Sequence, residues 1–278
     1  MIKWIIGIKG EVRVMNRKGK VIALVNQKGG VGKTTSSINL AASLGVLHKK
    51  VLLVDLDPQG NASTGLGINK ADFDKSVYDL LIDQAELKDV VMKTKFTNLY
   101  VIPATINLAG ADIELMEMSR MDPAFSKGTQ LKKYLDVTRD MFDYIIIDCP
   151  PSLGILTTNA LTAANSVIIP VQCEFFALEG IMQLLNTIML AQKKLNPTLD
   201  IEGVLLTMLD SRTNLGLEVV EDVKSYFKER VYDTIIPRLV RLSEAPSHGK
   251  PILAYDPQSR GTEAYLNLAK EVIARNGD

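Results

Sequence analysis

The stretch that decides the fold is Val21-Ile22-Ala23-Leu24-Val25-Asn26-Gln27-Lys28-Gly29-Gly30-Val31-Gly32-Lys33-Thr34-Thr35. Its apolar start predicts a buried strand, and the pattern that follows Thr35 predicts a helix. Glycines between a strand and a helix let backbone N–H groups turn toward phosphate oxygens, and the helix start adds partial positive charge. We therefore expect a phosphate-binding loop, in which Lys33 reaches the β- and γ-phosphates and the Thr34 hydroxyl ligates Mg²⁺.

Two further apolar runs end in aspartates: Val51-Leu52-Leu53-Val54-Asp55-Leu56-Asp57 and Tyr144-Ile145-Ile146-Ile147-Asp148. Either one alone is equally typical of a strand that ends in a capping or turn aspartate. Beside a phosphate-binding loop they fall where open α/β sheets bind ligands, at the carboxyl ends of strands. We expect the Asp148 carboxylate to hold a Mg²⁺-bound water, because Mg²⁺ keeps several waters and takes few protein ligands.

Predicted strands alternate with predicted helices along the chain, which indicates βαβ units in an α/β fold. Among these elements are a helix over 108–121, whose methionines we expect to be core residues, a strand over 204–210 and a strand that ends at Ile236-Pro237. We expect a single domain over residues 21–278, with a doubly wound, mostly parallel sheet and helices on both faces. We find no repeat or linker that marks a second domain. Residues 1–20 are predicted to be an N-terminal extension, explained by a misassigned start upstream of Met15 or by a short tag for a membrane or a partner.

Composition sets limits on function. The chain has 32 Lys plus Arg and 32 Asp plus Glu among 278 residues, so its overall charge gives no support to nucleic-acid binding. The two cysteines, Cys149 and Cys173, form no CxxC pair, which disfavours a disulfide framework or zinc site and fits a reducing cytoplasm. We expect both to be core residues. No apolar run approaches the ~20 residues of a membrane span.

The segment Lys28-Gly29-Gly30-Val31-Gly32-Lys33-Thr34-Thr35 resembles the deviant Walker A box of the ParA/MinD ATPases. Gln27 stands where the common motif has glycine, and Lys28 follows it. The resemblance implies ATP binding by all eight residues of this segment, with Lys28 reaching the nucleotide of a second subunit across a homodimer interface. It also implies that Asp57 orients the attacking water, that Asp55 supports the Mg²⁺ shell, and that Lys28 and Lys33 take part in catalysis.

The stretches 234–251 and 256–261 resemble the C-terminal signature of the chromosomal, Soj-type ParA proteins. That resemblance implies base contacts from Pro237 and Arg238, and DNA contact from Arg212. It further implies that the ATP-bound dimer binds non-specific nucleoid DNA and that a ParB-like, centromere-binding partner stimulates hydrolysis during chromosome or plasmid segregation.

Several alternatives stay open. Basic and acidic residues are equal in number between 189 and 260, which is typical of a solvated, ion-paired surface. A MinD-like ATPase that cycles on a membrane needs a basic amphipathic C-terminal helix. The predicted helix 261–275 has only Lys270 and Arg275 as basic residues, so we expect its apolar stripe to pack on the domain. An iron–sulfur ATPase resembling the nitrogenase iron protein and a scaffold with negligible turnover are the other two alternatives.

Overall fold

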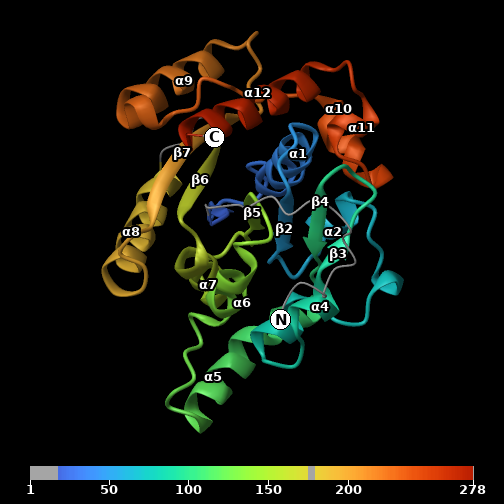
Figure 1. Ribbon diagram of the computed structural model, residues 1–278. Helices are drawn as coiled ribbons and strands as arrows, with labels where there is room; N and C mark the ends of the chain where they lie inside the picture. The colour runs from blue at the N-terminus through green and yellow to red at the C-terminus, as the bar shows by residue number, and fades with distance from the viewer. Residues whose placement is uncertain (1–17, 175–178, 278) are drawn as a thin grey trace.

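A seven-stranded sheet forms the centre of the computed structural model, which describes residues 18–174 and 179–277 (Figure 1). The strands are β1 (Lys20–Leu24), β2 (Val51–Asp55), β3 (Met92–Lys93), β4 (Leu99–Ile102), β5 (Tyr144–Asp148), β6 (Ser166–Gln172) and β7 (Asp200–Thr207). Their order is β3-β4-β2-β5-β1-β6-β7, and all neighbouring pairs are parallel except β3 with β4. The prediction of a mostly parallel sheet is confirmed.

Helices cover both faces of the sheet, as predicted for a doubly wound fold. The face with α1 (Lys33–Val46) and α12 (Arg260–Arg275) buries one apolar cluster. The face with α6 (Gln130–Thr138), α7 (Ile155–Ala163) and α8 (Glu179–Lys194) buries the other. Continuous apolar strands such as β5 are explained by this burial on both sides. The helices are α1 (Lys33–Val46), α2 (Asn61–Gly65), α3 (Val77–Leu81), α4 (Leu87–Val90), α5 (Ala111–Met121), α6 (Gln130–Thr138), α7 (Ile155–Ala163), α8 (Glu179–Lys194), α9 (Asn214–Phe227), α10 (Val240–Glu244), α11 (Ile252–Tyr255) and α12 (Arg260–Arg275), with short 3₁₀ turns η1 (Lys70–Asp72), η2 (Ile106–Gly110), η3 (Lys228–Arg230) and η4 (Ala245–His248).

The apolar stripe of α12 packs on the domain, as expected. Tyr265, Leu268 and Val272 are buried in the same cluster as α1, and the Tyr265 hydroxyl lies 3.1 Å from Ser36 Oγ. Within the described part of the chain, no helix is long and apolar enough to cross a membrane.

The structure differs from the predicted elements near the end of β7 and in α5. β7 stops at Thr207 because Met208 has a left-handed backbone, with φ 55°. The predicted strand around Ile236 makes only isolated parallel bridges, Val204 with Val231 and Leu209 with Pro237. The expectation that the methionines of α5 are core residues is wrong for Met116 and Met121, which are exposed, because α5 extends away from the sheet (Figure 1).

The N-terminal extension predicted over residues 1–20 lies almost entirely outside the described residues, since the description begins at residue 18 and β1 begins at Lys20. The explanations given for it therefore stay predictions.

Candidate active site

The glycine-rich loop joins β1 to α1 and is held from two neighbouring strands. The Asn26 side chain donates to the carbonyl of Pro170 in β6 (2.7 Å) and accepts from the Lys28 amide (2.9 Å). The Thr207 hydroxyl at the end of β7 donates to the Val31 carbonyl (2.9 Å). Gly30 and Gly32 have φ values of 76° and 86°, which side chains with a Cβ rarely adopt. Sequence reasoning missed Asn26 and Thr207, although each lies at a strand end beside the motif.

Lys33 is folded inward over this loop. It is only 6% exposed, and its Nζ donates to the Lys28 carbonyl (3.1 Å). Burial lowers the pKa of Lys33, while the carboxylates of Asp148 and Asp57 oppose that shift. By contrast, Lys28 is an exposed residue and does not line the pocket next to the loop.

The strands β2 and β5 lie side by side and place two aspartates in register, Asp55 opposite Asp148. Both carboxylates are fully buried. Burial and the neighbouring Asp55 raise the pKa of Asp148 to about 7, against the Thr34 and Ser37 hydroxyls, which donate hydrogen bonds to it. Burial likewise raises the pKa of Asp55 to about 6, against its hydrogen bonds from Ser63. Two buried acids side by side at the carboxyl ends of β2 and β5 form a site that favours a cation.

The donor set fits a Mg²⁺ ion. Among the described residues, Asp148 Oδ2 is one of the few buried side-chain oxygens without a hydrogen-bond partner. The Thr34 hydroxyl at the start of α1 is bonded to the same carboxylate. No group of three or more His, Cys, Asp or Glu side chains in the described ranges could hold a metal by itself. An ion here would take few protein ligands and complete its shell with water and phosphate, as Mg²⁺ does.

A pocket of about 590 Å³ opens over the loop. It brings together Lys33, Thr34 and Asp57 with most of the predicted loop residues. Its full lining is Gly29, Gly30, Gly32, Lys33, Thr34, Thr35, Asp57, Pro58, Gln59, Asn61, Ala109, Pro150, Pro151 and Met208. Of the other predicted ATP and metal residues, Val31, Asp55 and Asp148 are buried and do not line it. Met208 and Ala109 belong to no recognisable motif, and no sequence signal marks them as pocket residues.

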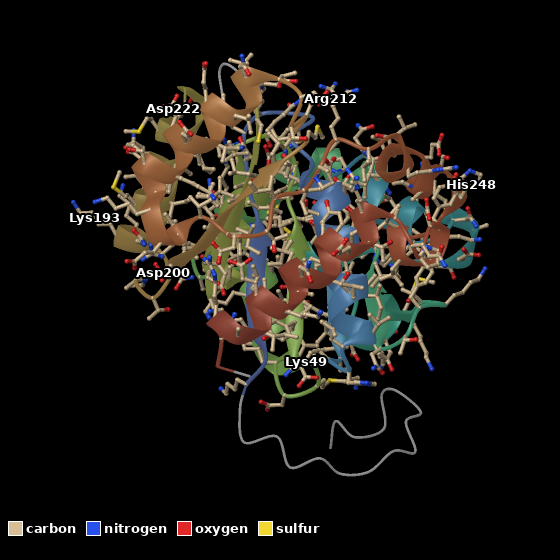
Figure 2. The ribbon with its side chains drawn as sticks, turned by 90° about the horizontal axis from the view of Figure 1, so that it is seen from above. Lys49, Lys193, Asp200, Arg212, Asp222 and His248 are labelled. Atoms are coloured by element: carbon tan, nitrogen blue, oxygen red, sulfur yellow. The ribbon has the colours of Figure 1, made fainter. Side chains whose placement is uncertain are left out.

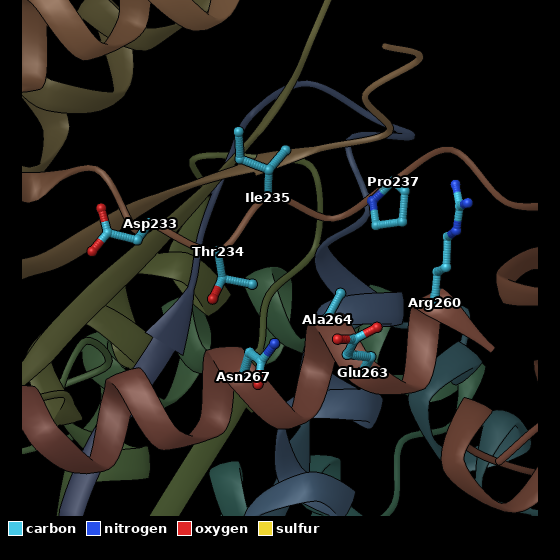
Figure 3. Close-up of a pocket in the computed structure, with 8 residues that line it drawn as sticks. All are labelled: Asp233, Thr234, Ile235, Pro237, Arg260, Glu263, Ala264 and Asn267. Atoms are coloured by element: carbon cyan, nitrogen blue, oxygen red, sulfur yellow. The ribbon is translucent and has the colours of Figure 1, made fainter. Parts of the chain in front are cut away.

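The two predicted base contacts do not line this pocket. Pro237 lines a separate groove of about 460 Å³, between the extended segment 233–237 and the first turns of α12 (Figure 3). Arg238 lines neither space, and its guanidinium lies 4.0 Å from Glu174. Their contact with a base therefore stays a prediction.

Arg212 lies in the turn between β7 and α9, on the outside of the molecule (Figure 2). Its side chain is 86% exposed and makes a two-pronged ion pair with Asp210, at 2.8 and 2.7 Å. These hydrogen bonds lower the pKa of Asp210 to about 2. The Thr213 hydroxyl then caps α9 by accepting from the Gly216 amide.

Both cysteines are buried core residues, as expected. Cys149 follows Asp148 at the end of β5, and Cys173 follows β6. Burial raises the pKa of both thiols. Because both thiols are buried, neither is placed to hold an iron–sulfur cluster between two subunits.

Comparison with known proteins agrees with this geometry. A family model described as an AAA domain matches residues 19–201. The chain is 64% identical over 256 residues to the sporulation initiation inhibitor protein Soj of Bacillus subtilis (strain 168), covering 92% of this chain and 99% of that protein. It is 50% identical over 258 residues to the chromosome partitioning protein ParA of Myxococcus xanthus (strain DK1622), covering 93% and 89%.

A solved structure similar to this one is cobyrinic acid a,c-diamide synthase from Mycobacterium smegmatis, crystallised with ADP and magnesium. It is 38% identical, with a TM-score of 0.78, and the match covers 91% of this chain and 93% of that one. The predictions of an ATPase and of ATP with Mg²⁺ as its nucleotide and metal are confirmed. The chain belongs to the ParA/MinD family of P-loop ATPases, among the Soj and ParA chromosome-partitioning proteins.

Proposed function

We propose that this ATPase forms a sandwich homodimer when it binds ATP and Mg²⁺, and that the dimer binds non-specific double-stranded DNA of the nucleoid. A ParB-like, centromere-binding partner stimulates hydrolysis and so releases the dimer from DNA, which drives segregation of a chromosome or plasmid. The observation that carries the proposal is the position of Lys28.

Lys28 is held through its backbone, and its exposed side chain does not line the pocket beside the loop. Its amide donates to Asn26 Oδ1, and its carbonyl accepts from Lys33 Nζ. Lys28 is an exposed residue of the phosphate-binding loop, and it is not among the residues that line the pocket over that loop. In a dimer, the Lys28 ammonium would contact the phosphates of the nucleotide bound by the other subunit. There it would offset the negative charge that develops during phosphoryl transfer.

Within one subunit, the roles follow from position. Lys33 and the loop amides bind the β- and γ-phosphates, because they converge on the pocket. Thr34 would ligate the metal directly and Asp148 through water, with Asp55 supporting the shell; bound Mg²⁺ neutralises charge on the phosphates. Asp57 lines the pocket at 8% exposure, and its Oδ1 accepts from the Gln59 amide (3.0 Å), so its carboxylate is oriented to hold a water for attack.

DNA binding rests on Arg212 and on dimer formation. A chain with equal numbers of basic and acidic residues binds phosphates only through local arrangement. Arg212 is a prominent exposed cation on a capped, ordered turn. Two copies in a dimer present two such arginines, so affinity for DNA rises with ATP through avidity. The names of the two relatives, Soj and ParA, support a role in chromosome partition.

The packing of α12 favours DNA over the membrane-cycling alternative. Its apolar residues Tyr265, Leu268 and Val272 are buried against α1. A helix whose apolar face is already covered offers no face for the lipid boundary.

The dimer is tested by light scattering on the Asp57→Ala variant, which should bind ATP without consuming it. We expect its mass to double with ATP and Mg²⁺ but not with ADP. The double variant Asp57→Ala with Lys28→Ala should still bind ATP yet stay monomeric. An Asp57→Ala protein that remains monomeric with ATP, or a double variant that dimerises equally well, would contradict the proposal.

A further inference from the structure

Ser63 is a buried hydroxyl at a junction of three elements. It lies in α2, is 3% exposed, and its Oγ donates to Asp55 Oδ2 at 2.7 Å. The Ser63 amide donates to the same oxygen at 2.8 Å. Its Oγ also accepts from the Ala104 amide, just beyond β4, at 3.2 Å. One side chain therefore ties α2 to the ends of β2 and β4.

The other oxygen of Asp55, Oδ1, contacts the backbone of a residue that lines the pocket, Asp57. The Asp57 amide donates to Asp55 Oδ1 (3.3 Å), and Asp57 in turn accepts from the Gln59 amide. Because two donors fix Oδ2, the carboxylate plane of Asp55 is set, and with it the direction in which Oδ1 faces the Asp57 turn. A chain of hydrogen bonds thus runs from Ser63 through Asp55 to the backbone of Asp57.

We propose that Ser63 is a positioning residue for ATP hydrolysis, whose hydroxyl orients Asp55 and, through Asp55, the turn that carries Asp57. The inference rests on the roles proposed above for Asp55 and Asp57. Ser63 does not line the nucleotide pocket. Of the predicted metal residues it contacts Asp55, through Oγ, and it makes no side-chain hydrogen bond to Thr34 or Asp148. Ser63 acts by fixing the orientation of the Asp55 carboxylate and so the position of Asp57. A small displacement of Asp57 has a large effect on the rate of hydrolysis.

Ser43 provides a matched control. It is another buried serine, in α1, and within the described chain its Oγ is one of the few buried side-chain atoms that lack a hydrogen-bond partner. Replacing it by alanine removes a buried hydroxyl without touching an acid. Any effect that Ser63→Ala shares with Ser43→Ala is therefore an effect on packing alone.

The experiment compares Ser63→Ala, Ser63→Thr and Ser43→Ala in three measurements: steady-state ATP hydrolysis, ADP affinity by calorimetry at varied Mg²⁺, and thermal melting. For Ser63→Ala we expect kcat to fall about tenfold, as for the loss of one hydrogen bond to a charged group. A higher Mg²⁺ concentration should be needed to reach half of the increase in ADP affinity that Mg²⁺ produces. ADP affinity measured without Mg²⁺, in the presence of a chelator, should be unchanged. Ser63→Thr keeps the hydroxyl and should restore both values, and Ser43→Ala should match the unmodified protein.

A Ser63→Ala protein that differs only in melting temperature would overturn the inference. Asp55→Asn separates this failure from a failure of the proposed site. If Asp55→Asn shifts the Mg²⁺ dependence and Ser63→Ala does not, the role of Ser63 is wrong and the site stands. If neither variant shifts it, the role proposed for Asp55 is wrong as well.

Discussion

Lys33 and Arg212 are both cations that follow the carboxyl end of a parallel strand, β1 and β7 respectively, but their surroundings differ. Lys33 is 6% exposed, bonded to the loop carbonyl of Lys28 and faced by buried aspartates. The Arg212 side chain is 86% exposed, and its ion pair is with Asp210, two residues away. The first cation belongs to a network held from several strands, and the second to a single turn.

This difference separates what each cation can do. Lys33 is buried, so its charge is weakly screened by solvent and acts strongly on a phosphate. At the Arg212 turn, solvent and salt screen the charge, and an exposed ion pair contributes little to stability. ATP binding can therefore depend on one lysine, whereas DNA binding needs several weak contacts acting together, as in a dimer.

The largest effect is expected at the pocket. Lys33→Ala removes the buried cation that the loop is built around and leaves Asp148 and Asp57 without it. We expect nucleotide binding to become undetectable by calorimetry at concentrations that saturate the unmodified protein. Retained ATP affinity would remove Lys33 from its role, and a thermal melt would show whether the variant is folded.

Charge reversal at the exposed turn should have a smaller and more selective effect. Arg212→Glu is expected to weaken DNA binding by roughly tenfold and to reduce its salt dependence, because a phosphate contact is lost in each subunit. ATP-driven dimerisation should be unchanged in light scattering. Unaltered DNA affinity would show that other residues carry the contact.

The pH dependence of stability tests the buried acids. Because burial raises the pKa of Asp148 to about 7 and that of Asp55 to about 6, the folded protein holds protons that the unfolded chain has released. Stability without metal should therefore fall as pH rises from about 4 to about 7. We expect a melting temperature that decreases across this window, with a shallower decrease in Asp148→Asn. An equal slope in both proteins would contradict the assignment.

The smallest effect is expected at Asp210. Asp210→Asn removes the anion that pairs with Arg212 and leaves the arginine free for phosphate. DNA affinity should rise by about two- to threefold at low salt, with the difference lost as salt screens the charge. A filter-binding or anisotropy titration at two salt concentrations checks this, and weaker binding would show that Asp210 orients Arg212 for DNA.

Much of the fold and of the pocket could be predicted from local pattern. The run Val21–Val25, the glycines and the strand-end aspartates Asp55 and Asp148 occur together with the spacing that is typical of a nucleotide-binding α/β sheet. Asn26, Ser63 and Thr207 were missed because their importance lies in contacts with residues far along the chain, such as Pro170, Ala104 and Val31. The exposure of Met121 was missed because an apolar residue in a helical pattern does not reveal whether another element covers it.

The most direct test of the account is the binding of Asp57→Ala protein to non-specific duplex DNA, with ATP and with ADP, across a series of salt concentrations. The account predicts binding only with ATP, and binding that weakens steadily as salt rises, because the release of counterions from DNA becomes less favourable. Equal binding with ADP, or none with ATP, would contradict an ATP-gated dimer that holds the nucleoid.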